Sequence, residues 1–147
     1  MTGHGEDILA FLDAAITARE KTARSAAVSF MGVPDGGTWV QRRDSHRGGY
    51  MISSPRGEER GAVDESVAFA FNESAATFIT LNDPTSILRR CAADRKLIAE
   101  HGPFSANDLG CKGCGLDGHE DLITGYYEDC PVLCVLAEGY GWTEGER

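Results

Sequence analysis

The chain has 147 residues, of which 41% are hydrophobic and 25% charged, a composition typical of one globular domain rather than of a disordered or fibrous protein. Its formal net charge of −9 argues against non-specific nucleic-acid binding as the main activity, because such binding needs Lys and Arg to neutralise phosphates. No window approaches the ~18 consecutive apolar residues of a membrane span, and the N-terminus lacks the pattern of a secretory signal, so we expect a cytoplasmic protein with no membrane segment.

The first predicted element is an amphipathic helix over residues 6–24. Its apolar residues recur at helical spacing and form one stripe: Ile8, Phe11, Leu12, Ala15 and Ile16. Acidic residues near its start and Lys21 and Arg24 near its end suit the helix dipole.

Residues 25–71 change in character to short apolar runs separated by turn signals. The turns are PDGG at 34–37, RGG at 47–49 and PRG at 55–57. Turns this short join antiparallel strands, so this segment predicts a small antiparallel meander.

Helices are predicted again after the meander. Asn72 can cap a short helix on which Ala75, Phe78 and Ile79 share a face. The pair Asp83-Pro84 is a stronger start signal for a second helix, which should end at His101 before Gly102 and Pro103. The interpretation is a single α+β domain over residues 1–147, in which residues 104–147 form a zinc-binding subdomain with a short helix from 130 to about 138.

Four cysteines near the C-terminus have the spacing C-x2-C-x15-C-x3-C: Cys111, Cys114, Cys130 and Cys134. Gly113 and Gly115 give a C-x2-C knuckle the freedom to turn around two thiolates. If Pro131 begins a helix, Cys130 and Cys134 lie one turn apart on one face. Four thiolates favour Zn²⁺, whereas disulfides, redox chemistry or unliganded core thiols are weaker interpretations in the cytosol.

The fourth ligand has an alternative. His119 gives the pattern C-x2-C-x4-H-x10-C, which would leave Cys134 as an ordinary thiol. Asp117 and His101 are more remote candidates, and His101 is interpreted as a helix-terminal residue. A closed site of four protein ligands is structural, because no position remains open for water or substrate.

Three stretches resemble a family of small proteins of unknown function encoded by actinobacteria and their phages. They are DILAFLDAAITAREKTAR, AATFITLNDPTSILRRCAADRKLIAEH and YEDCPVLCVLAEGY. The resemblance implies framework roles for Asp83, Pro84, Leu88, Arg89 and His101. It also implies that Cys111, Cys114 and Cys130 bind metal, whereas the family usually carries arginine where this chain has Cys134.

Two other clusters were weighed. Asp44-Ser45-His46 contains the residue types of a hydrolase triad, but neighbours in a strand point to opposite faces, so no catalytic residue is predicted. The basic hairpin with Arg42, Arg43, Arg47 and nearby Trp39 provides candidate contacts to phosphates and bases, although a solvated hairpin whose charges protect a sheet edge is the preferred interpretation.

The sequence therefore predicts a non-enzymatic protein with a structural Zn²⁺ site, a phage or prophage accessory factor that binds or modulates a host protein. Residues 103–147 carry nine acidic side chains against Lys112 and Arg147, a net charge of 2 − 9 = −7, which suits a basic protein partner. The alternatives are a zinc protein that binds nucleic acid through the basic hairpin, and an enzyme with a catalytic zinc.

Overall fold

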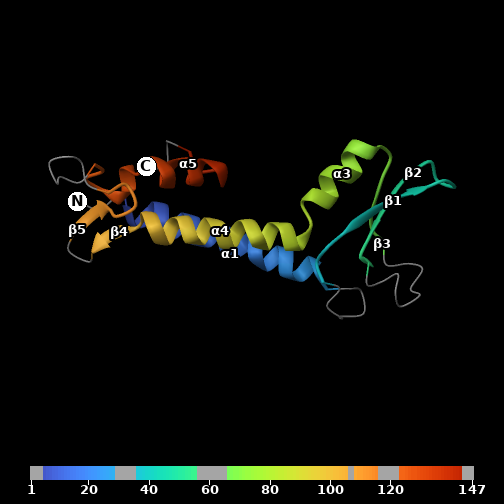
Figure 1. Ribbon diagram of the computed structural model, residues 1–147, viewed down its shortest axis with the longest axis horizontal. Helices are drawn as coiled ribbons and strands as arrows, with labels where there is room; N and C mark the ends of the chain where they lie inside the picture. The colour runs from blue at the N-terminus through green and yellow to red at the C-terminus, as the bar shows by residue number, and fades with distance from the viewer. Residues whose placement is uncertain (1–4, 29–35, 56–65, 106–107, 116–122, 144–147) are drawn as a thin grey trace. The chain divides into compact units, whose positions relative to one another are not determined.

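The computed structural model describes residues 5–28, 36–55, 66–105, 108–115 and 123–143, and has an α+β fold (Figure 1). The chain divides into two compact units. The terminal unit consists of residues 1–18 and 91–147, and the central unit of residues 19–90. Each unit is described by itself.

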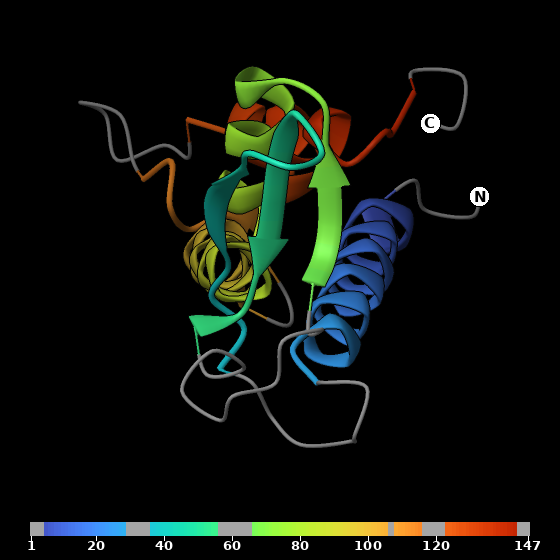
Figure 2. The same cartoon turned by 90° about the vertical axis from the view of Figure 1, so that its right-hand side faces the viewer.

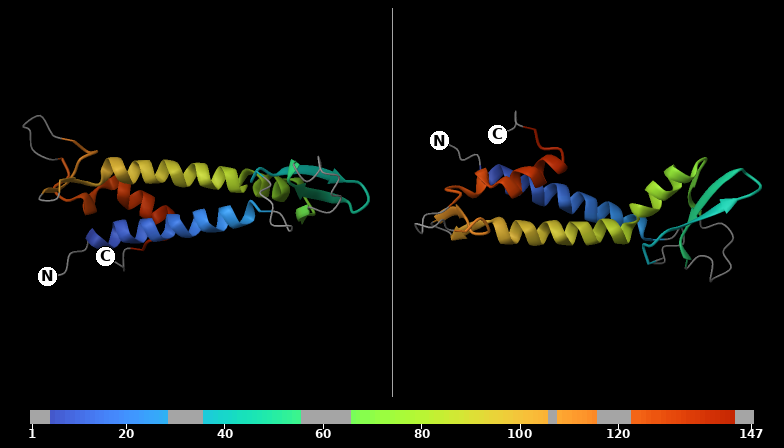
Figure 3. Two further views of the ribbon diagram at one scale, coloured as in Figure 1. Left: turned by 90° about the horizontal axis from the view of Figure 1, so that it is seen from below. Right: turned by 45° about the horizontal axis from the view of Figure 1, so that its top comes forward.

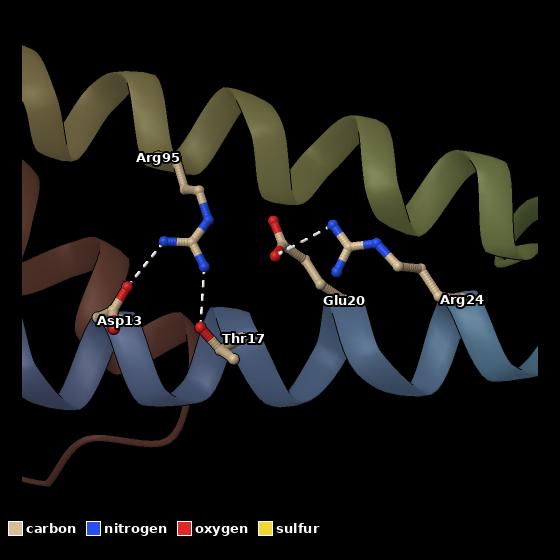
Figure 4. A network of polar contacts seen from close by, with 5 residues as sticks. All are labelled: Asp13, Thr17, Glu20, Arg24 and Arg95. Atoms are coloured by element: carbon tan, nitrogen blue, oxygen red, sulfur yellow. Dashed lines mark hydrogen bonds and ion pairs between the residues drawn. The ribbon is translucent and has the colours of Figure 1, made fainter.

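Two antiparallel helical segments form the frame of the terminal unit. They are the first part of α1 (Gly5–Ala26) and the last part of α4 (Pro84–His101), which run side by side (Figures 1 and 3). The guanidinium of Arg95 on α4 donates to Asp13 at 2.8 Å and to the hydroxyl of Thr17 at 2.9 Å, both on α1 (Figure 4). Because Asp13 is largely exposed, this ion pair contributes at most about 1 kcal/mol and mainly sets the register of the two segments.

The core of the terminal unit joins the apolar stripe of α1 to the C-terminal helix α5 (Pro131–Gly139). Leu12 and Leu133 are fully buried in it, and the ring of Phe11 meets that of Trp142 edge-on with centroids 4.7 Å apart. The same cluster contains Cys111 and Cys130. The cysteine-bearing segments therefore pack on the N-terminal helix and share its core.

Two further small elements complete this unit. Strands β4 (Pro103–Ser105) and β5 (Asp108–Cys111) form an antiparallel pair in which Pro103 lies opposite Cys111. A single 3-10 turn, η1 (Tyr127–Asp129), leads into α5. The β4–β5 pair folds the chain back, so that Cys111 returns to the end of α4.

The central unit contains a three-stranded antiparallel sheet in the order β1 (Val40–Asp44), β2 (Gly49–Ser53) and β3 (Ser66–Ala70). Helix α3 (Glu73–Leu81) lies behind the sheet in the view of Figure 2. Fully buried Ile52 of β2 packs with Ala70 and with Ala76 of α3. This cluster is the core of the central unit.

Side-chain caps explain where the helices of the central unit begin. The side chain of Asn72 accepts the backbone N–H of Ala75 at 2.8 Å and starts α3. The carboxylate of buried Asp83 accepts the N–H of Ser86 at 2.7 Å and that of Trp39 at 3.3 Å. Asp83 therefore caps α4 and also fastens the chain that leads into β1.

The main sequence predictions of the fold are confirmed, with two differences. The α+β class, the N-terminal helix, the antiparallel meander, both caps and the C-terminal helix are present. On α3, however, Ala76 takes the buried position, while Phe78 is 69% exposed. The β4–β5 pair was not predicted, because neither strand is longer than four residues.

No helix within the described parts of the chain combines the length and the apolar character needed to cross a bilayer.

Candidate metal centre

Four side chains with metal-binding atoms meet at the end of α4: His101, Cys111, Cys114 and Cys130. All four candidate ligand atoms lie within 4.8 Å of one another. They come from three places, namely the last residue of α4, the knuckle that follows β5, and the residue that precedes α5. The group therefore links segments that are far apart in the sequence.

Three of the six distances among these atoms match the edges of a metal coordination tetrahedron. Nδ1 of His101 lies 3.5 Å from Sγ of Cys111 and 3.4 Å from Sγ of Cys130. The Sγ atoms of Cys114 and Cys130 are 3.6 Å apart. Tetrahedral zinc with the usual bond lengths has edges of about 3.8 Å between two sulfurs and about 3.5 Å between sulfur and nitrogen. All three distances agree with this geometry to a few tenths of an ångström.

Local backbone contacts hold the knuckle beside α4. The N–H of Lys112 donates to the carbonyl of Gly102 at 3.2 Å, and the N–H of Cys111 donates to the carbonyl of Thr124 at 3.2 Å. Gly115 has φ +76°, a left-handed conformation that glycine adopts without strain. The chain can therefore turn sharply after Cys114 and point two thiols toward the same place.

Gly113 makes the approach of His101 possible. A Cβ atom at this position would lie 2.7 Å from the carbonyl oxygen of Glu100, 2.7 Å from Nδ1 of His101 and 2.8 Å from its Cε1. Such distances are too short for any side chain. The glycine in the middle of the knuckle is therefore required for the imidazole to reach the three sulfurs.

The electrostatic environment differs among the thiols. Burial raises the pKa of Cys130 to about 12. The backbone N–H groups of Leu133 and Val132 at the start of α5 act in the opposite direction and lower it in part. The pKa of Cys114 lies below its usual value, first because the buried hydroxyl of Thr124 donates to its sulfur. A bound cation stabilises all the thiolates together, since metal binding displaces thiol protons.

The structure brings together three of the four cysteines predicted as ligands and adds a residue that sequence reasoning set aside. Sγ of Cys134 donates to the carbonyl of Glu128 at 3.4 Å and is not part of the group. Cys130 stands before the helix, with φ −63° and ψ 118°, so the expected one-turn relation to Cys134 does not aim both sulfurs at one point. His119 and Asp117 lie outside the described residues.

His101 is the last residue of α4, as expected, and its ring also faces the cysteines. A usable signal was the position of a histidine ten residues before the C-x2-C knuckle, across a segment able to form a hairpin. All five cysteines, including buried Cys91 on α4, are free thiols.

The structure also describes the other clusters singled out in the sequence. The carboxylate of Asp44 accepts the backbone N–H groups of His46 at 2.9 Å and Arg47 at 3.1 Å, so it closes the β1–β2 turn. The Arg47 N–H is also the main reason why the pKa of Asp44 lies below its usual value. Arg42 and Arg43 are exposed on β1, whereas Trp39 packs against the core of the central unit.

Comparison with known proteins yields one relationship. No curated protein and no solved structure matches the chain. The model of DUF6221, a family of unknown function, matches residues 5–141, which include both helical segments of the terminal unit and all four residues of the metal-binding group. The chain belongs to the DUF6221 family.

Proposed function

We propose that His101, Cys111, Cys114 and Cys130 bind one structural Zn²⁺ ion and that the protein is not an enzyme. The observation that supports this most directly is the set of 3.4–3.6 Å distances among their ligand atoms. Three thiolates and one imidazole form a closed tetrahedral shell, which leaves no position for a substrate. In this role zinc cross-links the end of α4, the knuckle and the start of α5.

Zinc is the preferred ion because of the donor set. Thiolates select soft or borderline metals over Mg²⁺ and Ca²⁺, and a mixed sulfur and nitrogen tetrahedron suits zinc better than iron. Cys111 and Cys130 are fully buried, so the bound ion would be shielded from water on their side. The partly buried His101 and Cys114 would be the ligands nearer to solvent.

The fourth ligand is tested by comparing His101→Ala with Cys134→Ala. We expect the wild type and Cys134→Ala to contain one zinc per chain. His101→Ala should bind zinc more than about 100-fold more weakly, because replacing even a residue that only hydrogen-bonds to a ligand typically lowers metal affinity 10- to 100-fold. Metal content and competition with a chromogenic chelator give these values.

Substitution by Co²⁺ adds a spectroscopic criterion, since its visible absorption reports tetrahedral geometry and the number of thiolates. We expect the Co²⁺ spectrum to be unchanged in Cys134→Ala and altered in His101→Ala. The reverse result would make Cys134 the fourth ligand, and retention of the spectrum in both variants would point to His119. An enzyme with catalytic zinc would instead retain metal without one of its four ligands and bind an exchangeable water.

We further propose that the terminal unit binds a basic protein, as expected of an accessory factor of actinobacterial or phage type. The support is its charge: it contains 14 Asp and Glu against 4 Lys and Arg, a net charge of −10. Among the described acids, Glu100, Asp129 and Glu138 are exposed. Complementary charge of this size speeds association and selects partners.

The charge proposal predicts an interaction that depends on salt and on these acids. Affinity purification with the wild-type chain should recover a protein of high isoelectric point at low ionic strength. The double variant Asp129→Lys, Glu138→Lys should lose it, while Glu73→Lys, which changes an exposed acid of the central unit, should not. Equal recovery by all three proteins would contradict the proposal.

A further inference from the structure

The sheet of the central unit has two different faces. Gln41 of β1 hydrogen-bonds the hydroxyl of Thr77 on α3 at 3.3 Å, and the hydroxyl of Tyr50 donates to Glu73 of α3 at 3.4 Å. Arg43 lies opposite Tyr50 and shares this side of the sheet, which α3 covers. Residues at alternate positions belong to the other face.

That second face carries an arginine and two phenylalanines in one region. Arg42, Met51 and Phe69 lie opposite one another across β1, β2 and β3. Phe71 contacts Phe69 edge-on, with ring centroids 5.2 Å apart, although it is 82% exposed. We call Arg42, Met51, Phe69 and Phe71 the aromatic face.

The shape of this face depends on Gly49. A Cβ atom there would lie 2.5 Å from Cζ of Phe69, so the Phe69 ring lies directly over the glycine backbone. The end of the Phe69 ring is therefore held close to the backbone of β2. Phe71, which packs against this ring, is the more exposed of the two and offers its side chain for stacking.

The charge of the chain does not oppose an anionic ligand at this unit. The central unit has 10 Lys and Arg against 9 Asp and Glu, a net charge of +1, so the acidic excess of the chain belongs to the terminal unit. The β1–β2 hairpin itself carries three arginines, Arg42, Arg43 and Arg47, and one acidic residue, Asp44. The carboxylate of Asp44 is engaged in closing the turn. The hairpin is therefore locally cationic.

We propose that the aromatic face binds single-stranded nucleic acid. Exposed aromatic rings on an open sheet stack on unpaired bases, and an adjacent arginine contacts the phosphate backbone or stacks on a further base. Arginine, methionine and aromatic residues are also common in protein interfaces, so it is the positive charge of the β1–β2 hairpin that favours an anionic ligand here. The proposal is independent of the metal site and revises the residues suggested by the hairpin sequence: Arg42 and the phenylalanines replace Trp39 and Arg43.

The chain offers matched controls for a binding experiment with full-length protein. Phe78 is an exposed phenylalanine like Phe71 but lies on α3, and Arg43 is the neighbour of Arg42 on the opposite face. Fluorescence anisotropy is measured with labelled oligo(dT) and oligo(rU) of about 12 nucleotides, a length within the usual range of such sites, over a salt series. A duplex of the same length serves as the control, because its bases are paired and not available for stacking on the aromatic rings.

We expect both single strands to bind better than the duplex. Phe71→Ala should weaken binding about tenfold, the typical effect of losing one stacked base. Arg42→Ala should weaken binding and reduce the slope of log affinity against log salt by about 0.7, the value for one phosphate contact on a single strand. Phe78→Ala should bind within about twofold of wild type, and Arg43→Ala should lose less affinity than Arg42→Ala, because Arg43 lies on the face that α3 covers.

Three results would overturn the proposal: no binding by the wild type at the lowest salt, equal losses in the control variants, or a preference for duplex. Circular dichroism of each variant verifies the fold, and Phe71→Ala should be stable because its side chain is already exposed in the folded state. A difference between oligo(dT) and oligo(rU) would identify which nucleic acid the face prefers.

Discussion

Replacing Cys130 with serine should abolish stoichiometric zinc binding and lower the free energy of unfolding by more than about 3 kcal/mol. Cys130 is fully buried in the core that also contains Leu12 and Leu133, so its loss removes a ligand and leaves the remaining thiols without their common cation. Removing zinc from the wild type with a chelator should have a comparable effect. Denaturant unfolding with and without chelator measures both.

The loss should be concentrated around the metal centre. Hydrogen exchange should become faster at the amide of Cys111, which donates to Thr124, and at that of Cys134, which donates to Cys130. Cys134→Ala is the control, because its sulfur lies outside the group of four side chains and donates to the Glu128 carbonyl. This substitution should lower the free energy of unfolding by about 1 kcal/mol. Full zinc content in Cys130→Ser, or an unfolding midpoint insensitive to the chelator, would refute a structural metal site.

Gly113→Ala should weaken zinc binding by about 10- to 100-fold, although the substitution adds only a methyl group and removes no ligand. The added methyl group would be 2.7 Å from both the Glu100 carbonyl oxygen and Nδ1 of His101, and the helix backbone cannot yield as a flexible side chain can. The imidazole must therefore move away from the sulfurs. Chelator competition measures the affinity, and the Co²⁺ spectrum should show altered coordination.

Gly115→Ala separates this clash from backbone strain. Gly115 has φ +76°, yet nothing lies within 4 Å of the position that its Cβ would take. Its replacement should cost about 1 kcal/mol of stability with a smaller effect on zinc affinity. If both variants bound zinc equally, the close approach of His101 to the knuckle would have no functional importance.

Local signals were sufficient for most of the fold. The cap at Asn72, the start at Asp83-Pro84 and the alternation of short runs with turns are properties of neighbouring residues. Both helix starts, the RGG turn and three antiparallel strands appear where they were expected, whereas parts of the PDGG and PRG segments lie outside the described residues. Phe78 was the exception, because a face shared by apolar residues does not reveal which part of it the sheet will cover. Ala76 fits against Ile52, and the larger ring is left outside.

The metal centre shows where local reasoning fails. Cys111, Cys114 and Cys130 were predicted to lie together from residue type and spacing, whereas His101 was interpreted only as the end of a helix. Its relation to the cysteines depends on the β4–β5 pair, which places Pro103 opposite Cys111 and carries the knuckle back to α4. Strands of three and four residues have almost no periodicity, so the periodicity of the sequence does not predict the pair that brings these four side chains together. The spacing of His101 from the knuckle was the usable signal.

The discontinuity of the terminal unit has a consequence for synthesis on the ribosome. Residues 19–90 are continuous, so their contacts are available as soon as that stretch has emerged. Ile8 and Leu12, by contrast, have their partners around Leu133 and Ala137, more than a hundred residues later. The apolar stripe of the first helix must therefore remain without its final partners until Leu133 and Ala137 have been made, and capture of a metal by Cys130 would come after the contacts of residues 19–90 are available.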